Sequence, residues 1–210
     1  MKEWSSFKEL FEVLNTECNC LVLRNYTDIS DEGKKDGVHE DIDFLCEDQA
    51  RFIEVVGCEP RKSAKDKIHQ KISVGGAVIP IDIRYVGDGY YDPAWEADML
   101  KNKRLYNELF YIPDEKDEFY SLIYHAVIQK NTISKDYAVK LAAIAGIPEF
   151  TEEWGLKELE SFMREKGYRY TYPVYPGGIF RKDKASKDLA ESNAPRALKR
   201  LLWKLHIRML

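Results

Sequence analysis

The stretch Asp41-Ile42-Asp43-Phe44-Leu45-Cys46 predicts a β-strand with one acidic face and one apolar face. Because successive side chains of a strand point to opposite sides, Asp41 and Asp43 stand side by side, while Ile42 and Phe44 point toward the core. Two like charges at this spacing repel each other, and a cation between them removes the repulsion. Paired carboxylates are hard oxygen ligands that suit Mg²⁺, so the stretch predicts a cation site.

A second predicted strand, Ile79-Pro80-Ile81-Asp82-Ile83-Arg84-Tyr85, carries a third acid in the same kind of pattern. Its isoleucines alternate with Asp82, and Arg84 shares the face of Asp82. Solvent-facing aspartates on a half-exposed sheet are the alternative interpretation. We favour a site, because aspartate is a poor strand former and three of them in strands need a reason. Three acids on two strands can hold two cations, which clamp the attacking and leaving oxygens of a phosphoryl or nucleotidyl transfer.

The segments around these two strands predict an α/β domain over residues 1–115. Ser5 can cap a helix whose apolar positions recur at three- and four-residue spacing. Gly75-Gly76, between two alternating runs, predicts a β-hairpin over residues 68–86, because two glycines supply the positive φ angles of a tight turn. The other predicted elements of this domain are strands at 20–23 and 109–112, a loop at 25–37, and helices begun by Asp48 and Pro93.

The pattern becomes helical from Asp117 onward and predicts a mostly helical region over residues 116–210. A first helix follows Asp117, and we expect His125 on it to be a structural histidine. Helices capped by Ser134 and Thr151 should end near Gly146 and Gly167. A basic helix over residues 194–210 completes the region, so the predicted fold class is α/β (α+β).

Composition excludes several classes of protein. The 210 residues include 32 Lys+Arg, 36 Asp+Glu and 44% hydrophobic residues, which is typical of a folded soluble chain rather than a disordered one. No stretch approaches the ~20 apolar residues of a membrane span, and the first residues are too polar for a signal peptide. We therefore expect a cytoplasmic protein. The four cysteines match no zinc spacing, and we expect them to be buried thiols.

The net charge of −4 hides an asymmetry between the last thirty residues and the rest. Residues 181–210 carry nine Lys/Arg and three acids, or +6, so residues 1–180 carry −10. We expect the basic helix over 194–210 to pack its apolar face on the helical region. Contact with an anionic membrane surface is a weaker alternative. Nucleic acid is disfavoured, because the rest of the chain is acidic and no binding motif accompanies the helix.

The order of a strand, a loop, an Asp-x-Asp strand and a later strand with one Asp resembles the polymerase-β-type nucleotidyltransferase superfamily, over about residues 5–130. The resemblance implies a mixed sheet flanked by helices. It also implies an enzyme dependent on Mg²⁺ or Mn²⁺ that moves a nucleotidyl group from a nucleoside triphosphate to a hydroxyl of a small molecule or glycan precursor. Asp41 and Asp43 would be metal ligands, and Asp82 a ligand that also helps to activate the acceptor hydroxyl.

One departure from the superfamily concerns the nucleotide phosphates. Leu23-Arg24-Asn25-Tyr26 stands where members usually have Gly-Ser or Gly-Gly. Arg24, with Asn25 beside it, can replace the glycines as a phosphate anchor, since guanidinium binds phosphate oxygens bidentately. His39 and Arg84 complete the predicted nucleotide-binding set. Two alternatives stay open. One is transfer of a phospho-alcohol from a CDP-activated donor, as in the similar choline-phosphate and fukutin-like group. The other is a non-catalytic nucleotidyltransferase-like antitoxin or binding module.

Overall fold

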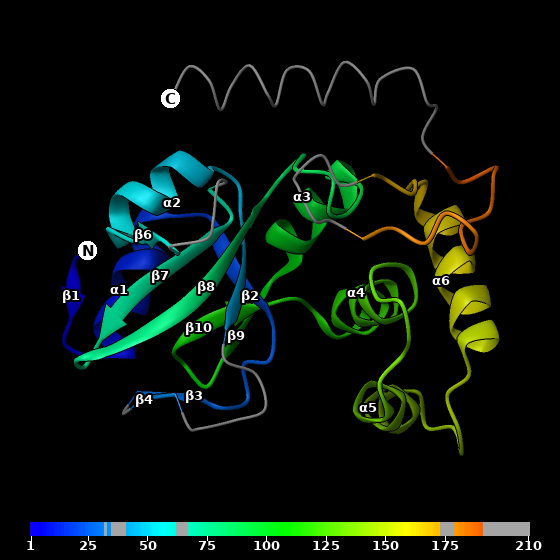
Figure 1. Ribbon diagram of the computed structural model, residues 1–210, viewed down its shortest axis with the longest axis horizontal. Coiled ribbons are helices and arrows are strands. Elements are labelled where there is room, and N and C mark those ends of the chain that lie inside the picture. Colours follow the sequence, from blue (N-terminus) through cyan, green and yellow to red (C-terminus); the bar gives the residue numbers. More distant parts are fainter. Residues whose placement is uncertain (32, 35–40, 62–66, 173–178, 191–210) are drawn as a thin grey trace. The chain divides into compact units, whose positions relative to one another are not determined.

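The computed structural model describes residues 1–31, 33–34, 41–61, 67–172 and 179–190. The chain divides into two compact units, Met1–Val86 with Glu96–Asp114, and Gly87–Trp95 with Glu115–Leu210. In their described parts the first unit holds a mixed sheet flanked by helices and the second is mostly helical, which confirms the predicted mixed α/β fold class (Figure 1). The predicted basic helix over 194–210 lies outside the described residues.

The sheet of the first unit has six strands among the described residues, in the order β1-β7-β8-β5-β2, with β6 beside β7. Its centre is the parallel pair β5 (Ile42–Cys46) and β8 (Ala77–Tyr85). The strands β2 (Cys20–Arg24) and β7 (His69–Val74) flank this pair in the antiparallel direction. The two-residue strands β1 (Glu3–Trp4) and β6 (Glu59–Pro60) both pair with β7.

The predicted hairpin over 68–86 is confirmed, because β7 and β8 pair directly across Gly75-Gly76. These glycines have φ angles of 58° and 79°, the left-handed values that a tight turn of this kind requires. The predicted loop at 25–37 was wrong in part, since β3 (Ile29–Ser30) pairs with β4 (Gly33–Lys34) inside it. Another short pair joins β9 (Arg104–Tyr106) to β10 (Phe110–Ile112).

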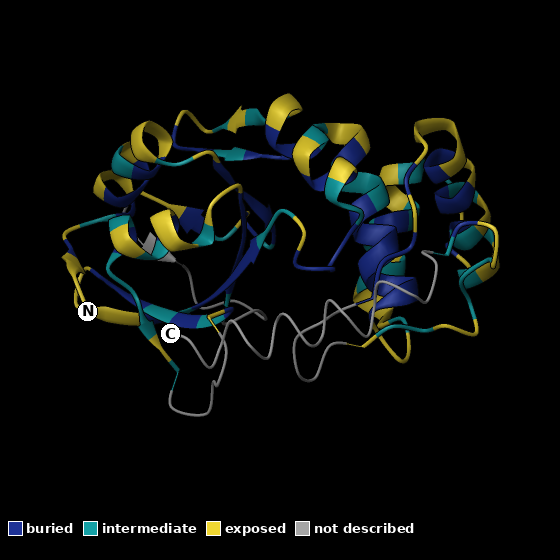
Figure 2. Ribbon diagram, turned by 90° about the horizontal axis from the view of Figure 1, so that it is seen from above, coloured by how far each residue is buried: buried dark blue, intermediate teal, exposed yellow. Residues whose placement is uncertain are grey.

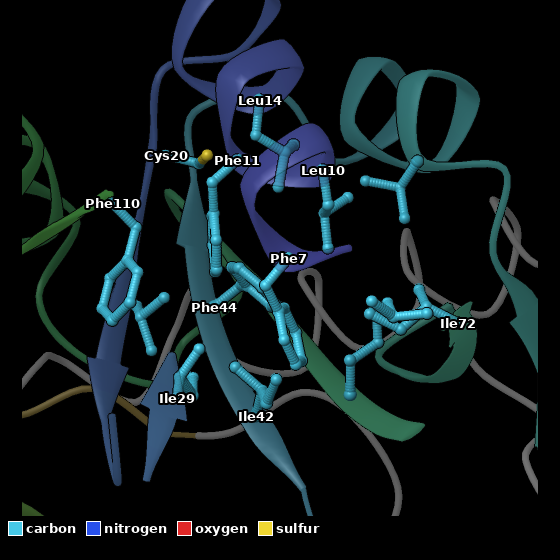
Figure 3. Packing of buried hydrophobic residues seen from close by; sticks show 14 of the residues in the cluster. Phe7, Leu10, Phe11, Leu14, Cys20, Ile29, Ile42, Phe44, Ile72 and Phe110 are labelled. Carbon is cyan, nitrogen blue, oxygen red and sulfur yellow. The ribbon is translucent and has the colours of Figure 1, made fainter. Parts of the chain in front are cut away.

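Helices α1 (Phe7–Glu17) and α2 (Gln49–Val56) cover one face of the sheet. Figure 3 shows the α1 side chains pointing at the strands. Full burial of each such side chain stabilises the fold by about 1.5–3 kcal/mol. The main members of this core are Phe7, Leu10, Phe11, Leu14, Val22, Ile42, Phe44, Phe52, Ile81, Ile83 and Phe110.

The start of α1 lies one residue later than predicted. The Oγ of Ser6, not of Ser5, accepts a hydrogen bond from the backbone N–H of Glu9 at 3.2 Å. The Glu9 carboxylate in turn accepts from the Ser5 backbone N–H at 2.7 Å. This reciprocal arrangement resembles a capping box, and it satisfies the Glu9 N–H, which the first helical turn leaves without a partner, and the N–H of Ser5 before the cap. Asp48 caps α2 as predicted.

The helices after β8 follow the predicted pattern, and Figure 2 shows α4 as mostly buried. Ser134 and Thr151 cap α5 and α6, which end at Gly146 and Gly167 with positive φ angles, as predicted. None of the helices in the described ranges combines the length and apolarity that crossing a membrane demands. The bounds of the four are α3 (Pro93–Asn102), α4 (Glu115–Ile128), α5 (Lys135–Ala145) and α6 (Glu152–Lys166).

Candidate active site on the sheet

Two buried carboxylates stand side by side on the face of the sheet opposite α1 and α2. The parallel register of β5 and β8 pairs Asp43 directly with Asp82. Ile42 and Phe44 on β5 belong to the core under the helices, so strand alternation turns Asp43 to the other side. Both aspartates are buried. Alternation puts both aspartates on this face, and the parallel register of β5 and β8 brings these two of the three candidate acids together.

The register of the outer strands extends this pair into a charged row of four residues. Arg24 on β2 pairs with Asp43, and His69 on β7 pairs with Asp82. Residues directly opposite each other on antiparallel strands share a face, so the charged row runs Arg24, Asp43, Asp82, His69 across four strands. His69 was not a candidate from sequence, although counting outward from the two-residue Gly75-Gly76 turn pairs it with Asp82.

A β-bulge brings Arg24 into the charged row. Cys20 and Val22 on β2 belong to the core, and simple alternation would send Arg24 to that same face. The pairing changes from Val22–Phe44 to Arg24–Asp43, so β2 advances two residues while β5 advances one. The extra residue, Leu23, shifts the alternation by one position. Arg24 thereby reaches the acidic face.

Arg24 and Asp43 form the most enclosed ion pair of the site. The Nη2 of Arg24 donates to Asp43 Oδ1 at 2.8 Å, and the two side chains are only 9% and 6% exposed. A charge-assisted hydrogen bond in such a setting is about twice as strong as a neutral one. Arg24 was predicted to anchor phosphate, and in this structure it neutralises the carboxylate predicted to hold a cation.

Asp82 lies among three cationic or titratable side chains. Arg61, just after β6, donates from Nη2 to Asp82 Oδ1 and to the carbonyl oxygen of Ile81. The Nε2 of His69 and the Nη2 of Arg84 each lie 3.9 Å from Asp82 Oδ2. Burial and then the charge of Asp43 raise the pKa of Asp82, while Arg84, His69 and Arg61 oppose the rise. Asp43 and Asp82 thus repel each other across the two strands, whereas the sequence predicted repulsion between Asp41 and Asp43.

Arg61 is a site residue that the sequence did not reveal. It precedes the polar segment at 62–66, where no alternation marks a strand or a face. Its backbone N–H donates to the His69 carbonyl oxygen at 3.2 Å, which continues the pairing of β6 with β7. Only this pairing, which has no local sequence signal, brings Arg61 to Asp82.

The remaining predicted residues have separate outcomes. Asp41 is half-buried and lies one residue before β5, not within it. Within the described ranges no group of three or more His, Cys, Asp or Glu side chains is placed to hold a metal ion, so the three predicted acids do not gather into one cluster there. Asn25 follows β2 with a φ of 59°, in the left-handed region that Asn tolerates. His39 lies outside the described residues.

Asp43 and Asp82 are two carboxylates that could hold Mg²⁺ only together with ligands from outside this pair. Mg²⁺ usually keeps several waters and takes one or two protein carboxylates together with substrate phosphates. Two neighbouring carboxylates and three arginines supply the groups for such a ternary site, with carboxylates for the cation and guanidiniums for phosphate. The donor set therefore suits a metal–phosphate complex better than a metal alone.

His125, in the second unit, belongs to a separate buried hydrogen-bond network. Its Nδ1 lies 2.9 Å from the Tyr90 hydroxyl and 3.2 Å from Gln129 Oε1. The Gln129 amide donates to the Tyr90 carbonyl oxygen at 2.8 Å. Such satisfied contacts fit the structural role expected for His125.

Comparison of the chain with protein-family models, with curated proteins and with solved structures finds no match. Its chemistry is therefore argued from the geometry of the charged row and its neighbours.

Proposed function

We propose that the protein is a Mg²⁺-dependent transferase that moves a nucleotidyl group from a nucleoside triphosphate to a hydroxyl of a small molecule or glycan precursor. The observation that supports this proposal is the pairing of Asp43 with Asp82 on adjacent parallel strands, buried and bordered by three arginines. Burying two acids next to each other destabilises the fold, and such costly arrangements cluster at functional sites.

In this proposal Asp43 and Asp82 would hold the ion, which when bound neutralises charge on the reacting phosphate oxygens. Asp82 would also orient the acceptor hydroxyl as a hydrogen-bond acceptor. Arg24 and Arg84 would bind and orient the donor phosphates through their planar guanidiniums. Asn25, at the end of β2, stands next to the proposed phosphate anchor.

A CDP-activated donor is the second candidate, in which a phospho-alcohol moves to the acceptor. It is favoured by Arg24-Asn25 at the place where the similar superfamily uses glycines, because side chains and not backbone amides then contact the phosphates. The third candidate function is a binding module that catalyses no reaction. All four cysteines are free, but only Cys20 and Cys46 are buried as expected, while Cys18 and Cys58 are half-buried. The absence of disulfides among them suits the cytoplasmic location that we propose.

Two measurements test these proposals. Thermal-shift titration with nucleoside triphosphates and CDP-alcohols, with and without Mg²⁺, identifies a donor, because a ligand of the folded state raises the melting temperature. Mass spectrometry then detects pyrophosphate from a triphosphate donor or CMP from a CDP-alcohol, with polyols and sugars as acceptors. Binding without either product supports the binding module. A chain that binds no donor overturns both transferase proposals and favours the binding module.

Site variants connect any turnover to the acid pair. We expect Asp43→Asn and Asp82→Asn to abolish product formation with the far-UV circular dichroism unchanged. Asp41→Asn shows how many acids the site uses. Loss of product formation indicates three acids, and retained product formation indicates two. Glu54→Gln is the matched control, since Glu54 is an exposed carboxylate on α2 that pairs with Arg51. Full activity of Asp43→Asn would refute the proposed chemistry.

A further inference from the structure

The proposed cation site already contains positive charge. Among the described residues of the ion pairs at this site, Asp43 and Asp82 contribute two negative charges, whereas Arg24, Arg61 and Arg84 contribute three positive ones. A divalent cation that binds alone must displace these guanidiniums from the carboxylates or bind against their electrostatic repulsion. A polyphosphate that approaches alone meets the two carboxylates. Each ligand removes the obstacle to the other, because the cation takes the carboxylates and the polyphosphate takes the arginines.

Arg61 is the residue placed to change partners. Its side chain is 30% exposed, against 9% for Arg24, so it lies at the solvent border of the site and can swing without opening the core. Its Nε is buried and has no hydrogen-bond acceptor among the described residues. A buried donor of this kind generally has an acceptor in the functional state of a protein. A phosphate oxygen supplies one.

We propose that Arg61 exchanges its Asp82 partner for a phosphate oxygen when a divalent cation binds Asp82, so that the cation and a polyphosphate ligand bind with positive coupling. This inference rests on the proposed cation site at Asp43 and Asp82. It adds that neither ligand alone binds well and that Arg61 carries the coupling. By linkage the effect is reciprocal, so each ligand increases the affinity of the other by the same factor.

The test measures binding and not turnover, on the full chain. Calorimetric titrations use Mn²⁺ alone, inorganic tripolyphosphate with a chelator, and the preformed Mg²⁺–tripolyphosphate complex. For the wild type we expect the complex to bind at least about tenfold more tightly than tripolyphosphate alone, within the usual range of coupling between sites. Equal affinities would overturn the inference without any variant.

The variant Arg61→Gln separates partner exchange from a structural role, because it moves two affinities in opposite directions. Mn²⁺ alone should bind about tenfold more tightly, since the competing guanidinium is gone, while Mg²⁺–tripolyphosphate should bind more weakly. Arg61→Lys keeps the charge without the planar fork and should restore part of the coupling. Loss of fold would weaken both ligands and is checked by circular dichroism.

Arg51→Gln is the matched control, since Arg51 also pairs with carboxylates, Glu17 and Glu54, but on the exposed side of α2. It should leave all three affinities unchanged. If the wild type binds neither Mn²⁺ nor the complex, the proposed function fails together with this inference. If it binds the complex with coupling that Arg61→Gln leaves intact, only the role of Arg61 is overturned.

Discussion

Removal of the Arg24 guanidinium should expose the cost of burying Asp43. The two side chains pair at 2.8 Å and are almost fully enclosed. The substitution Arg24→Met keeps most of the side-chain volume and removes the positive charge. Removing one partner of a buried ion pair generally costs about 3–5 kcal/mol, because the other charge stays buried without compensation. We expect a loss near the lower limit, about 3 kcal/mol at pH 7, since the arginines around Asp82 remain in the same unit.

Proton uptake limits this penalty and gives it a pH dependence. An aspartate of an unfolded chain has a pKa of about 3.9, and each pH unit above it corresponds to about 1.4 kcal/mol for binding a proton. Protonating the carboxyl that has lost its partner therefore costs about 4 kcal/mol of free energy at pH 7 and about 1.5 kcal/mol at pH 5. The destabilisation by Arg24→Met should shrink to about 1.5 kcal/mol or less at pH 5. The double variant Arg24→Met/Asp43→Leu, which removes both charges, should recover most of the lost stability at both pH values.

Residue-resolved hydrogen exchange of the β5 and β8 amides measures this effect. A chain with two compact units can unfold in two steps. The β5 and β8 amides lie in the first unit, so their exchange reports the unfolding free energy of that unit alone. Arg51→Met is the control, because it breaks exposed ion pairs and should cost no more than about 1 kcal/mol. If Arg24→Met costs no more than Arg51→Met, or if its cost is the same at pH 5 and pH 7, Arg24 is not the counter-charge of Asp43.

Three further predictions concern other parts of the chain. Burial raises the pKa of Asp82, so its protonated form stabilises the fold at low pH, and this contribution is lost as the pH rises through the raised pKa. The stability of Asp82→Asn relative to the wild type should therefore increase from pH 4 to pH 7, as urea unfolding midpoints would show. A decrease in its midpoint relative to the wild type over this range would contradict the prediction. Gly155→Ala should lower the melting temperature despite the better helix propensity of alanine, because a methyl group there would lie 2.8 Å from Phe150 Cε2. Burial raises the pKa of Cys20 to about 12, so iodoacetamide at pH 8 should leave it unmodified in the native protein and label it in urea, as peptide mass spectrometry would show.

Local signals predicted the helices and the hairpin well. Asp48, Ser134 and Thr151 each place a side-chain oxygen on a backbone N–H of the first turn, which depends only on neighbouring residues. The start of α1 shows the limit of such signals. Ser5 and Ser6 can both act as caps, and the contact of Glu9 with the Ser5 backbone decides between them. Ambiguity of this size moves an element by one residue and leaves the fold unchanged.

The candidate site was harder to predict, because strand register and not composition builds it. Alternation placed Asp43 and Asp82 on polar faces, but their direct pairing follows from the parallel contact of β5 with β8. Asp41 shared the pattern and yet lies outside β5. The position of Arg61 depends on how β6 pairs with β7, between partners ten and twelve residues apart, whereas that of His69 follows from counting outward from the Gly75-Gly76 turn. No periodicity within one segment predicts the pairing of β6 with β7.

The bulge in β2 shows how one residue changes the chemistry of the site. Without the extra Leu23, Arg24 would follow Val22 toward the apolar core, and Asp43 would lose its closest counter-charge. With Leu23 in the bulge, the local charge at this point of the sheet differs from the net negative charge of residues 1–180. Two acids here contact three arginines. Acidity summed over the chain predicts attraction of a lone cation. Local charge balance favours instead a cation that arrives with an anionic partner, which is the property that a metal–polyphosphate substrate has.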